Sequence, residues 1–184
     1  MTTDAECSDR DLIKRAASGD RAAFEVIVRR HKQPLFRLIR RYLGNSDDAY
    51  DVLQDTFVSA WTALGRFDIS RPLIPWLRTI ALNKCRDFSR RQAIRRVILG
   101  LFASEADSQA STDISDTHGE RLDRLDRAIA ELPIFYKEPL LLTAVSGLSH
   151  QEAAAVLKVT PKAIEMRVRR ARQKLAKVMP PAEG

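Results

Sequence analysis

The sequence predicts an all-α protein with two small helical domains joined by a flexible acidic linker, the second domain containing a helix-turn-helix. Three observations support this fold class. Apolar residues recur three and four positions apart in most segments. Basic residues are missing from positions 97–120, where acidic residues and serines gather. Near the C-terminus, a short capped segment and a turn precede a basic amphipathic segment. The expected boundaries are residues 1–96, 97–119 and 120–184.

Composition excludes several classes of protein. The 184 residues are 45% hydrophobic, which suits globular packing. No apolar run approaches the roughly 20 residues that cross a bilayer, and the polar N-terminus does not resemble a signal peptide. We therefore expect a cytoplasmic protein without membrane insertion. Cys7 and Cys85 are distant in sequence and the three histidines lie in unrelated contexts, so no metal site, disulfide framework or cofactor is predicted.

The first domain should begin with three helices. Residues 9–18 form a short helix that ends at Gly19, and Asp20 caps a long helix that continues to residue 43. Pro34, in the middle of that helix, predicts a kink or a break. Ser46 or Asp47 can cap the third helix, whose outward face is acidic and polar. That face is either a surface for a basic partner or an ordinary solvated face.

A loop follows at residues 65–75, punctuated by one glycine and two prolines. Phe67 and Ile69 are interleaved there with Arg66 and Arg71. This pattern suits stacking on an unpaired base, as in single-strand binders. The alternative is that both apolar side chains fold back into the core.

Residues 76–96 are predicted to form a helix with one packing face and one cationic face. Trp76 and Cys85 fit the packing face, Trp76 as a core anchor; the alternative for Trp76 is a wedge that separates DNA strands. Two basic clusters, one in this helix and one at residues 158–177, flank the acidic gap. With a net charge of +7 and an isoelectric point near 9.8, they suggest two contacts with one polyanion.

The second domain should resume with a helix from residue 120, a boundary at Leu132 and an apolar helix at residues 134–145. Ser149 and Glu152 then form a capping box, and Thr160 caps a further helix. The inward stripe of this last helix comprises Ile164, Val168, Ala171, Leu175 and Val178. Its cations suit the major groove of DNA, although a solvated amphipathic helix is the simpler alternative.

Several motifs, taken in order, resemble one family. They are Asp11-Leu12-Ile13 with Gly19-Asp20 and Ala23-Phe24; Asp51 to Phe57; Arg66-Phe67 with Pro75 to Asn83; Leu132-Pro133 with Gly147-Leu148-Ser149; and Arg170-Ala171-Arg172. Together they resemble the extracytoplasmic-function sigma factors, the small two-domain specificity subunits of bacterial RNA polymerase. The similarity covers nearly the whole chain. It implies a subunit for promoter-specific transcription initiation, with core RNA polymerase and promoter DNA as partners.

The resemblance also implies roles for individual residues. The surface that binds core polymerase would comprise Asp51, Gln54, Asp55 and Phe57. The minus-ten element would be bound by Phe67, Asp68, Ile69, Ser70, Arg71, Asn83, Arg86 and Arg90. The minus-thirty-five element would be read by Lys162, Arg167, Arg169 and Arg170. The family is usually held inactive by an anti-sigma factor, and a stress response is the expected setting.

The sequence departs from the commoner family pattern in two places. Glu165 is an acid where the family usually contacts DNA, so it either accepts from a cytosine amine or points to solvent. The loop 68–72 lacks the glycine often found there, which predicts an altered minus-ten preference. The alternative function is a self-sufficient DNA-binding regulator with a helical sensor domain. An enzyme is not expected, because no phosphate loop, metal cluster or nucleophile and base pair is present.

Overall fold

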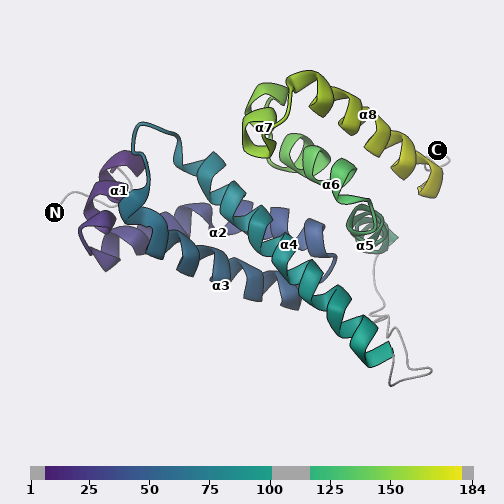
Figure 1. The fold of residues 1–184 in the computed structure, drawn as a ribbon, viewed down its shortest axis with the longest axis horizontal. Coiled ribbons are helices and arrows are strands. Elements are labelled where there is room, and N and C mark those ends of the chain that lie inside the picture. The colour runs from purple at the N-terminus through teal and green to yellow at the C-terminus, as the bar shows by residue number, and fades with distance from the viewer. Residues whose placement is uncertain (1–6, 101–116, 180–184) are drawn as a thin grey trace.

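The computed structural model describes residues 7–100 and 117–179, and every regular element in these two ranges is a helix. The prediction of an all-α fold is therefore confirmed. Figure 1 shows α1 to α4 on one side of the molecule and α5 to α8 on the other. No helix in the described ranges is long and apolar enough to span a membrane.

The N-terminal helices are α1 (Asp9–Ala17), α2 (Arg21–Leu43), α3 (Ser46–Ala63) and α4 (Leu73–Gly100), with a 3₁₀ turn at Leu64–Arg66. Asp20 caps α2 as predicted, its carboxylate accepting from the Ala23 amide at 3.1 Å. The cap of α3 is Asn45, not Ser46 or Asp47. Its side-chain oxygen accepts from the amides of Asp47 and Asp48 at 2.7 and 3.2 Å.

Helix α2 continues through Pro34 without a break. Pro34 is exposed, whereas the residues before and after it on the opposite face are buried. That buried stripe includes Ile27 and His31 before the proline, and Leu35 and Leu38 after it. Packing on both sides offsets the roughly 3 kcal/mol that an interior proline costs a helix.

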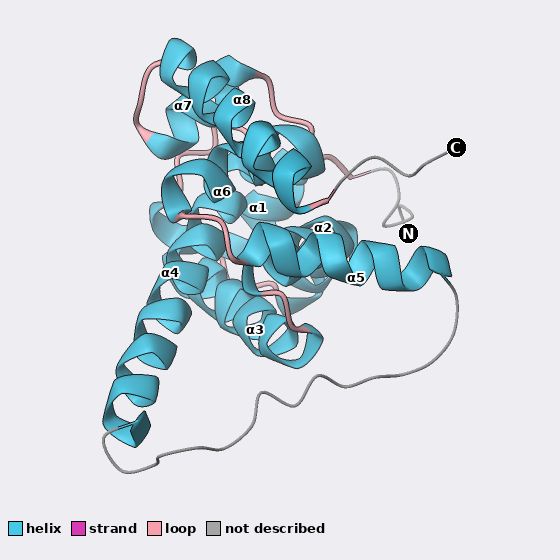
Figure 2. Cartoon of the chain, turned by 90° about the vertical axis from the view of Figure 1, so that its right-hand side faces the viewer, coloured by secondary structure: helices cyan, strands magenta, loops and turns pink. Residues whose placement is uncertain are grey.

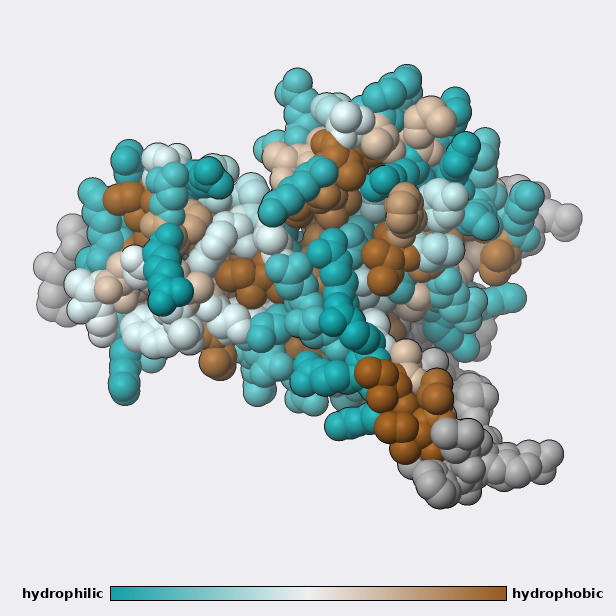
Figure 3. Space-filling model, viewed as in Figure 1, coloured by the Kyte–Doolittle hydropathy of each residue, from teal (hydrophilic) through white to brown (hydrophobic). Residues whose placement is uncertain are grey.

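Helix α4 extends four residues beyond the predicted end of the first domain. Its C-terminal end projects away from the other helices (Figure 2), and Ile94, Val97 and Ile98 are exposed there (Figure 3). These three side chains do not pack on the described part of the chain. Most of the predicted linker, residues 101–116, lies outside the described residues.

The C-terminal helices are α5 (Thr117–Ala130), α6 (Ile134–Leu140), α7 (His150–Leu157) and α8 (Pro161–Val178). A π-helical stretch, Leu141–Val145, follows α6 directly. The predicted helix at residues 134–145 is thus present, but it is an α-helix only as far as Leu140 and a π-helix from Leu141. Ile164, Val168 and Ala171 are buried on α8 as predicted, whereas Val178 is exposed because α8 extends past the helices that it packs on.

Both sets of helices share one core. Helix α2 contacts α1, α3 and α4 on the N-terminal side, and also α5 and the π-helical stretch. Buried residues from all of these elements form one apolar cluster, which includes Leu38, Tyr42, Leu141 and Leu142. The C-terminal helices are therefore docked on the N-terminal ones in this structure.

The continuity of α2 predicts the effect of replacing its proline. Pro34→Ala restores a backbone donor inside an intact helix, so the free energy of unfolding should rise by about 1–3 kcal/mol. Urea unfolding monitored by circular dichroism measures it. Gln33→Ala, at the exposed neighbouring position, should change stability by no more than about 0.5 kcal/mol. A loss of stability in Pro34→Ala would contradict the role given to packing around the proline.

Candidate nucleic-acid interface

Helices α7 and α8 form the predicted helix-turn-helix. The Ser149 hydroxyl accepts from the Glu152 amide at 3.2 Å, and the Glu152 carboxylate accepts from the Ser149 amide at 2.8 Å, which completes the capping box. Lys158 adopts a left-handed conformation (φ 53°) at the end of α7. Thr160 then caps α8 by accepting from the Ala163 amide at 3.2 Å. Both predicted caps are thus present.

The cations of α8 differ in their availability. Lys162, Arg169 and Arg170 are exposed. Arg167 is half-buried because its guanidinium lies over the Phe135 ring, 4.4 Å from the centroid. The helix therefore presents most of its predicted DNA-binding residues, with Arg167 held against α6.

Glu165 pairs with a neighbouring cation on α8. Its carboxylate accepts from the Lys162 ammonium at 2.9 Å, and both side chains are exposed. This hydrogen bond and the charge of Lys162 lower the pKa of Glu165. In this structure Glu165 thus faces solvent and partly neutralises Lys162, which weakens that cation as a phosphate contact.

The loop between α3 and α4 is held by its own polar residues. The Asp68 carboxylate accepts from the Ser70 amide and hydroxyl at 3.0 and 2.6 Å, which lowers the pKa of Asp68. Arg71 pairs with Asp68 at 3.3 Å. The Phe67 ring lies 4.6 Å from the Trp76 ring, centroid to centroid, and Ile69 remains at the surface. Phe67 is therefore partly packed, and Trp76 is half-buried instead of a full core anchor.

A cleft of about 530 Å³ separates this loop from α7. Phe67, Pro75 and Trp76 form its N-terminal wall, and Ala155 and Val156 form its C-terminal wall. The predicted minus-ten loop and the first helix of the helix-turn-helix therefore face one another. In this arrangement the loop and α7 each partly cover the other's surface.

The cations of α4 are only partly free. Arg86 donates from Nε and Nη2 to the Glu138 carboxylate of α6 at 2.6 and 2.5 Å, and from Nη1 to Asn83 at 3.0 Å. The hydrogen bonds to Glu138 raise the pKa of Arg86. Arg90 is exposed and lies 3.7 Å from Asp87. Asn83 and Arg86 thus lie together as expected, but Arg86 contacts α6.

The acidic face of α3 is exposed at Asp51, Gln54 and Asp55. Phe57 is 8% exposed, and its ring lies 6.4 Å from Phe24 in an edge-to-face contact. Phe57 therefore packs in the core, because it lies on the helix face opposite the acidic residues. Sequence reasoning also missed Tyr50 and Val58, which add exposed apolar area to α3.

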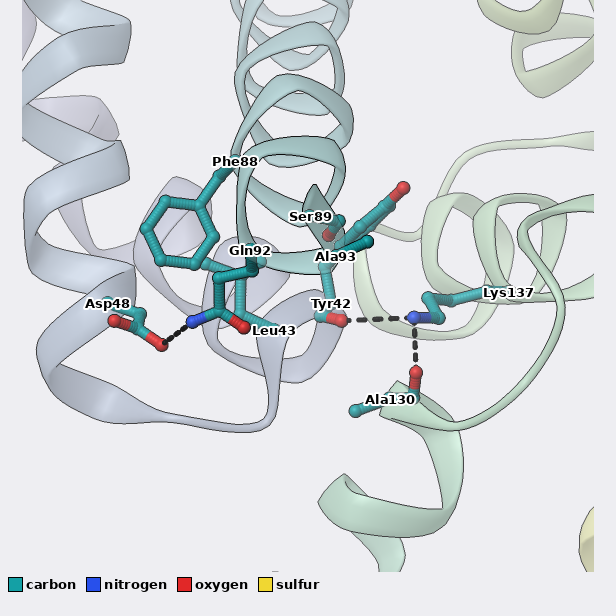
Figure 4. A pocket seen from close by; sticks show the side chains of 9 residues that line it. All are labelled: Tyr42, Leu43, Asp48, Phe88, Ser89, Gln92, Ala93, Ala130 and Lys137. Carbon is teal, nitrogen blue, oxygen red and sulfur yellow. Dashed lines mark hydrogen bonds between the residues drawn. The ribbon is translucent and has the colours of Figure 1, made fainter. Parts of the chain in front are cut away.

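Two charged groups at the junction of the two sets of helices, Lys137 and Glu138, were also missed. Figure 4 shows Lys137 pointing toward the ends of α2 and α5, where its ammonium donates to the Tyr42 carbonyl at 3.3 Å and to the Ala130 carbonyl. Burial lowers the pKa of Lys137. Glu138 is buried beside it and accepts from the Tyr42 hydroxyl at 3.4 Å. An apolar helix pattern gave no signal that these groups would be buried and paired.

Comparison with known proteins gives two family matches in chain order. Residues 27–95 match sigma-70 region 2, and residues 122–175 match sigma-70 region 4. The ECF RNA polymerase sigma factor SigM of Mycobacterium tuberculosis is 31% identical over 95% of this chain and 86% of its own length. The chain belongs to the extracytoplasmic-function (ECF) sigma factors.

Two solved structures are similar to this ECF sigma factor over both regions. One is CnrH, the RNA polymerase sigma factor of Cupriavidus metallidurans, in complex with the cytosolic domain of CnrY. It is 37% identical, with a TM-score of 0.71 over 92% of this chain and 96% of that one. The other is the sigma factor RpoE of Bartonella quintana in complex with the anti-sigma factor NepR, at 26% identity and a TM-score of 0.67, covering 84% and 95% of the two chains.

The family assignment settles the class of function. Sigma factors are transcription initiation factors of RNA polymerase and not enzymes. The α3 face, the loop and most of α4 lie in the region 2 match, and the helix-turn-helix lies in the region 4 match. The predicted surfaces therefore fall on the matched regions of an ECF sigma factor.

The capping box of this sigma factor makes a pH-dependent contribution to stability. The hydrogen bonds from Ser149 lower the pKa of Glu152, so this contribution is present above the pKa of Glu152 in the unfolded chain and is lost as the pH falls through its folded value. In a carboxyl NMR titration, Ser149→Ala should raise the pKa of Glu152 toward the ordinary glutamate value. Thr160→Ala, which removes the other cap, should leave that pKa unchanged. An unchanged pKa in Ser149→Ala would show that the capping box does not form in solution.

Proposed function

We propose that this ECF sigma factor binds core RNA polymerase through α3, opens the minus-ten element with the loop and α4, and reads the minus-thirty-five element with α8. The observation that carries the proposal is the capped helix-turn-helix with exposed cations, on the same chain as an exposed acidic helix and a loop of apolar and basic residues. The corresponding units are residues 1–96 and 120–184, joined by residues 97–119, and the place of action is the cytoplasm.

The polymerase contact rests on charge complementarity. Asp51 and Asp55 are one helical turn apart, and Gln54 lies beside them, all exposed on one face of α3. A basic surface on the polymerase clamp would pair with this face and guide association. Phe57 supports it from within by packing on Phe24, so its contribution is to the shape of α3 and not to direct contact.

Opening of the minus-ten element rests on the loop. DNA stacking is worth on the order of 1.4 kcal/mol per base-pair step, so unpaired bases must be held once they are exposed. Ile69 and the aromatic pair Phe67 and Trp76 offer apolar surface for this, on a loop shaped by Asp68 and Ser70. Asn83, Arg86 and Arg90 follow along α4 at helical spacing and would hold the adjacent backbone.

Reading of the minus-thirty-five element rests on α8. Arg169 and Arg170 are exposed and face away from the buried stripe of Ile164 and Val168. Arginine forks suit both guanine edges and phosphates. Lys162 contributes less because Glu165 is paired with it, and Arg167 must leave the Phe135 ring to reach DNA.

Control by an anti-sigma factor in a stress response is part of the proposal. RpoE of Bartonella quintana was solved with the anti-sigma factor NepR, and this chain is similar to it over both regions. The alternative, a self-sufficient regulator with a sensor domain, is not favoured by the structure. The cleft of about 530 Å³ opens between the two sets of helices, not within a sensor domain.

The test is a run-off transcription assay with core bacterial polymerase on pooled promoter fragments, with and without this protein. Transcripts that start at defined sites only when the protein is added are the expected result, and alignment of the start sites would reveal the two elements. Specific duplex binding by the folded protein, without core binding or defined starts, would instead establish the autonomous regulator.

The roles of the α8 cations predict the salt dependence of duplex binding. Arg169→Ala and Arg170→Ala should each weaken binding of the holoenzyme to promoter DNA. If the lost contact is to a phosphate, the slope of log K against log salt should fall by about one. Fluorescence anisotropy across a salt series measures both quantities. Lys14→Ala, which removes an exposed cation from α1, is the control and should leave the slope unchanged. Affinities and slopes that both equal those of the control would remove Arg169 and Arg170 from the interface.

A further inference from the structure

The carboxylate of Glu138 and the guanidinium of Arg86 form a two-point ionic contact between α6 and α4. The two donor to acceptor distances are 2.6 and 2.5 Å, in the parallel geometry that arginine adopts with carboxylates and phosphates. The Glu138 side chain is 5% exposed and that of Arg86 is 36% exposed. One partner is thus deeply buried, while the other lies at the edge of the junction.

Glu138 is held in place by its surroundings. The Tyr42 hydroxyl donates to it at 3.4 Å, and Tyr42 is itself 1% exposed in the shared core. The adjacent Lys137 ammonium is occupied by the carbonyls of Tyr42 and Ala130. The carboxylate therefore has a fixed position and depends on Arg86 for most of its charge compensation.

Other polar contacts fasten the same two sets of helices together. Arg78 of α4 is buried and donates to the Ser146 carbonyl, before α7, at 2.8 Å. Arg41 of α2 pairs with Asp126 of α5 at 3.2 Å. In each case a cation from the N-terminal helices meets an acceptor from the C-terminal helices. The junction thus combines apolar packing with directed ionic contacts.

This docked arrangement is incompatible with simultaneous contact to both promoter elements. The elements are about 25 base pairs apart, which is on the order of 80 Å along B-DNA. In the structure, the loop that would hold the minus-ten strand faces α7 across a single cleft. The two sets of helices must separate before both elements can be bound.

We propose that Glu138 is an internal competitor of the DNA backbone for Arg86, and that their contact is a latch that keeps the free sigma factor closed. A carboxylate and a phosphate present similar paired oxygens, so Arg86 cannot hold both at once. The proposal rests on the assignment of Arg86 to the DNA backbone. Release of the latch shifts the equilibrium toward separated helices and frees the cation, which couples opening to DNA binding.

The test measures opening and DNA binding on the full chain. Separation of the two sets of helices is followed by double electron–electron resonance, which measures the distance between two spin labels. The labels are attached to cysteines introduced by Arg10→Cys in α1 and Gln173→Cys in α8. The background is Cys7→Ser, and the buried Cys85 stays unlabelled. DNA binding is followed by fluorescence anisotropy with a short random-sequence DNA single strand labelled with fluorescein. Circular dichroism checks that each variant is folded.

Glu138→Gln removes the charge with little change of shape. It should raise the ratio of open to closed molecules, and the affinity for the single strand, by about tenfold. Arg86→Lys keeps a cation for phosphate but loses the two-point contact, so it should shift both quantities in the same direction. Arg86→Gln should open the protein without any gain in affinity. Glu131→Gln, which changes an exposed carboxylate directly after α5, is the matched control.

The outcomes separate the latch from the proposed function. Label distances in Glu138→Gln and Arg86→Lys that equal those in Glu131→Gln would overturn the proposal. Opening with the same gain of affinity in Arg86→Gln as in Glu138→Gln would also overturn it, because Arg86 would then not contact DNA. In that case run-off transcription with the same variants decides independently whether the sigma factor function stands.

Discussion

Burial of one face of α2 is the constraint on which the rest of the structure depends. Residues such as Ile27 and Leu38 pack against the N-terminal helices, and Tyr42, near the C-terminal end, contacts the C-terminal ones. Helix α2 continues through Pro34 because this burial extends on both sides of the proline. The acidic face of α3 and the cationic faces of α4 are oriented by packing on the same helix. A rigid central helix therefore sets the directions of the surfaces assigned to polymerase and DNA.

Cations have two kinds of partner in this protein. Arg169, Arg170 and Arg90 lie at the surface, where a phosphate can reach them. Arg78 and Arg86 are engaged by groups of the C-terminal helices. A protein that binds a polyanion with separated basic clusters can regulate itself by offering its own anions to one of them. The charge distribution thus links DNA binding to the arrangement of the helices.

The local features of the helix-turn-helix could be predicted almost completely. Ser149 with Glu152, and Thr160 with Pro161, are short-range signals, because each cap is a contact between residues three positions apart. The inward stripe of α8 was likewise readable from its spacing up to Ala171. The spacing also predicted that Val178 faces inward, which is wrong because helical periodicity does not say where the neighbouring helices end.

The sequence by itself determined the helical fold, the caps, the segregation of charge and the family, because these depend on neighbours within one or two turns or on motifs in chain order. Tertiary structure alone decided that Phe57 packs inward, that Arg167 rests on Phe135, and that Arg86 meets Glu138 across 52 positions of sequence. Such contacts depend on how separate helices dock. Lys137 and Glu138 resemble ordinary solvated charges within an apolar segment, and only packing against Tyr42 and Arg86 shows that both are buried.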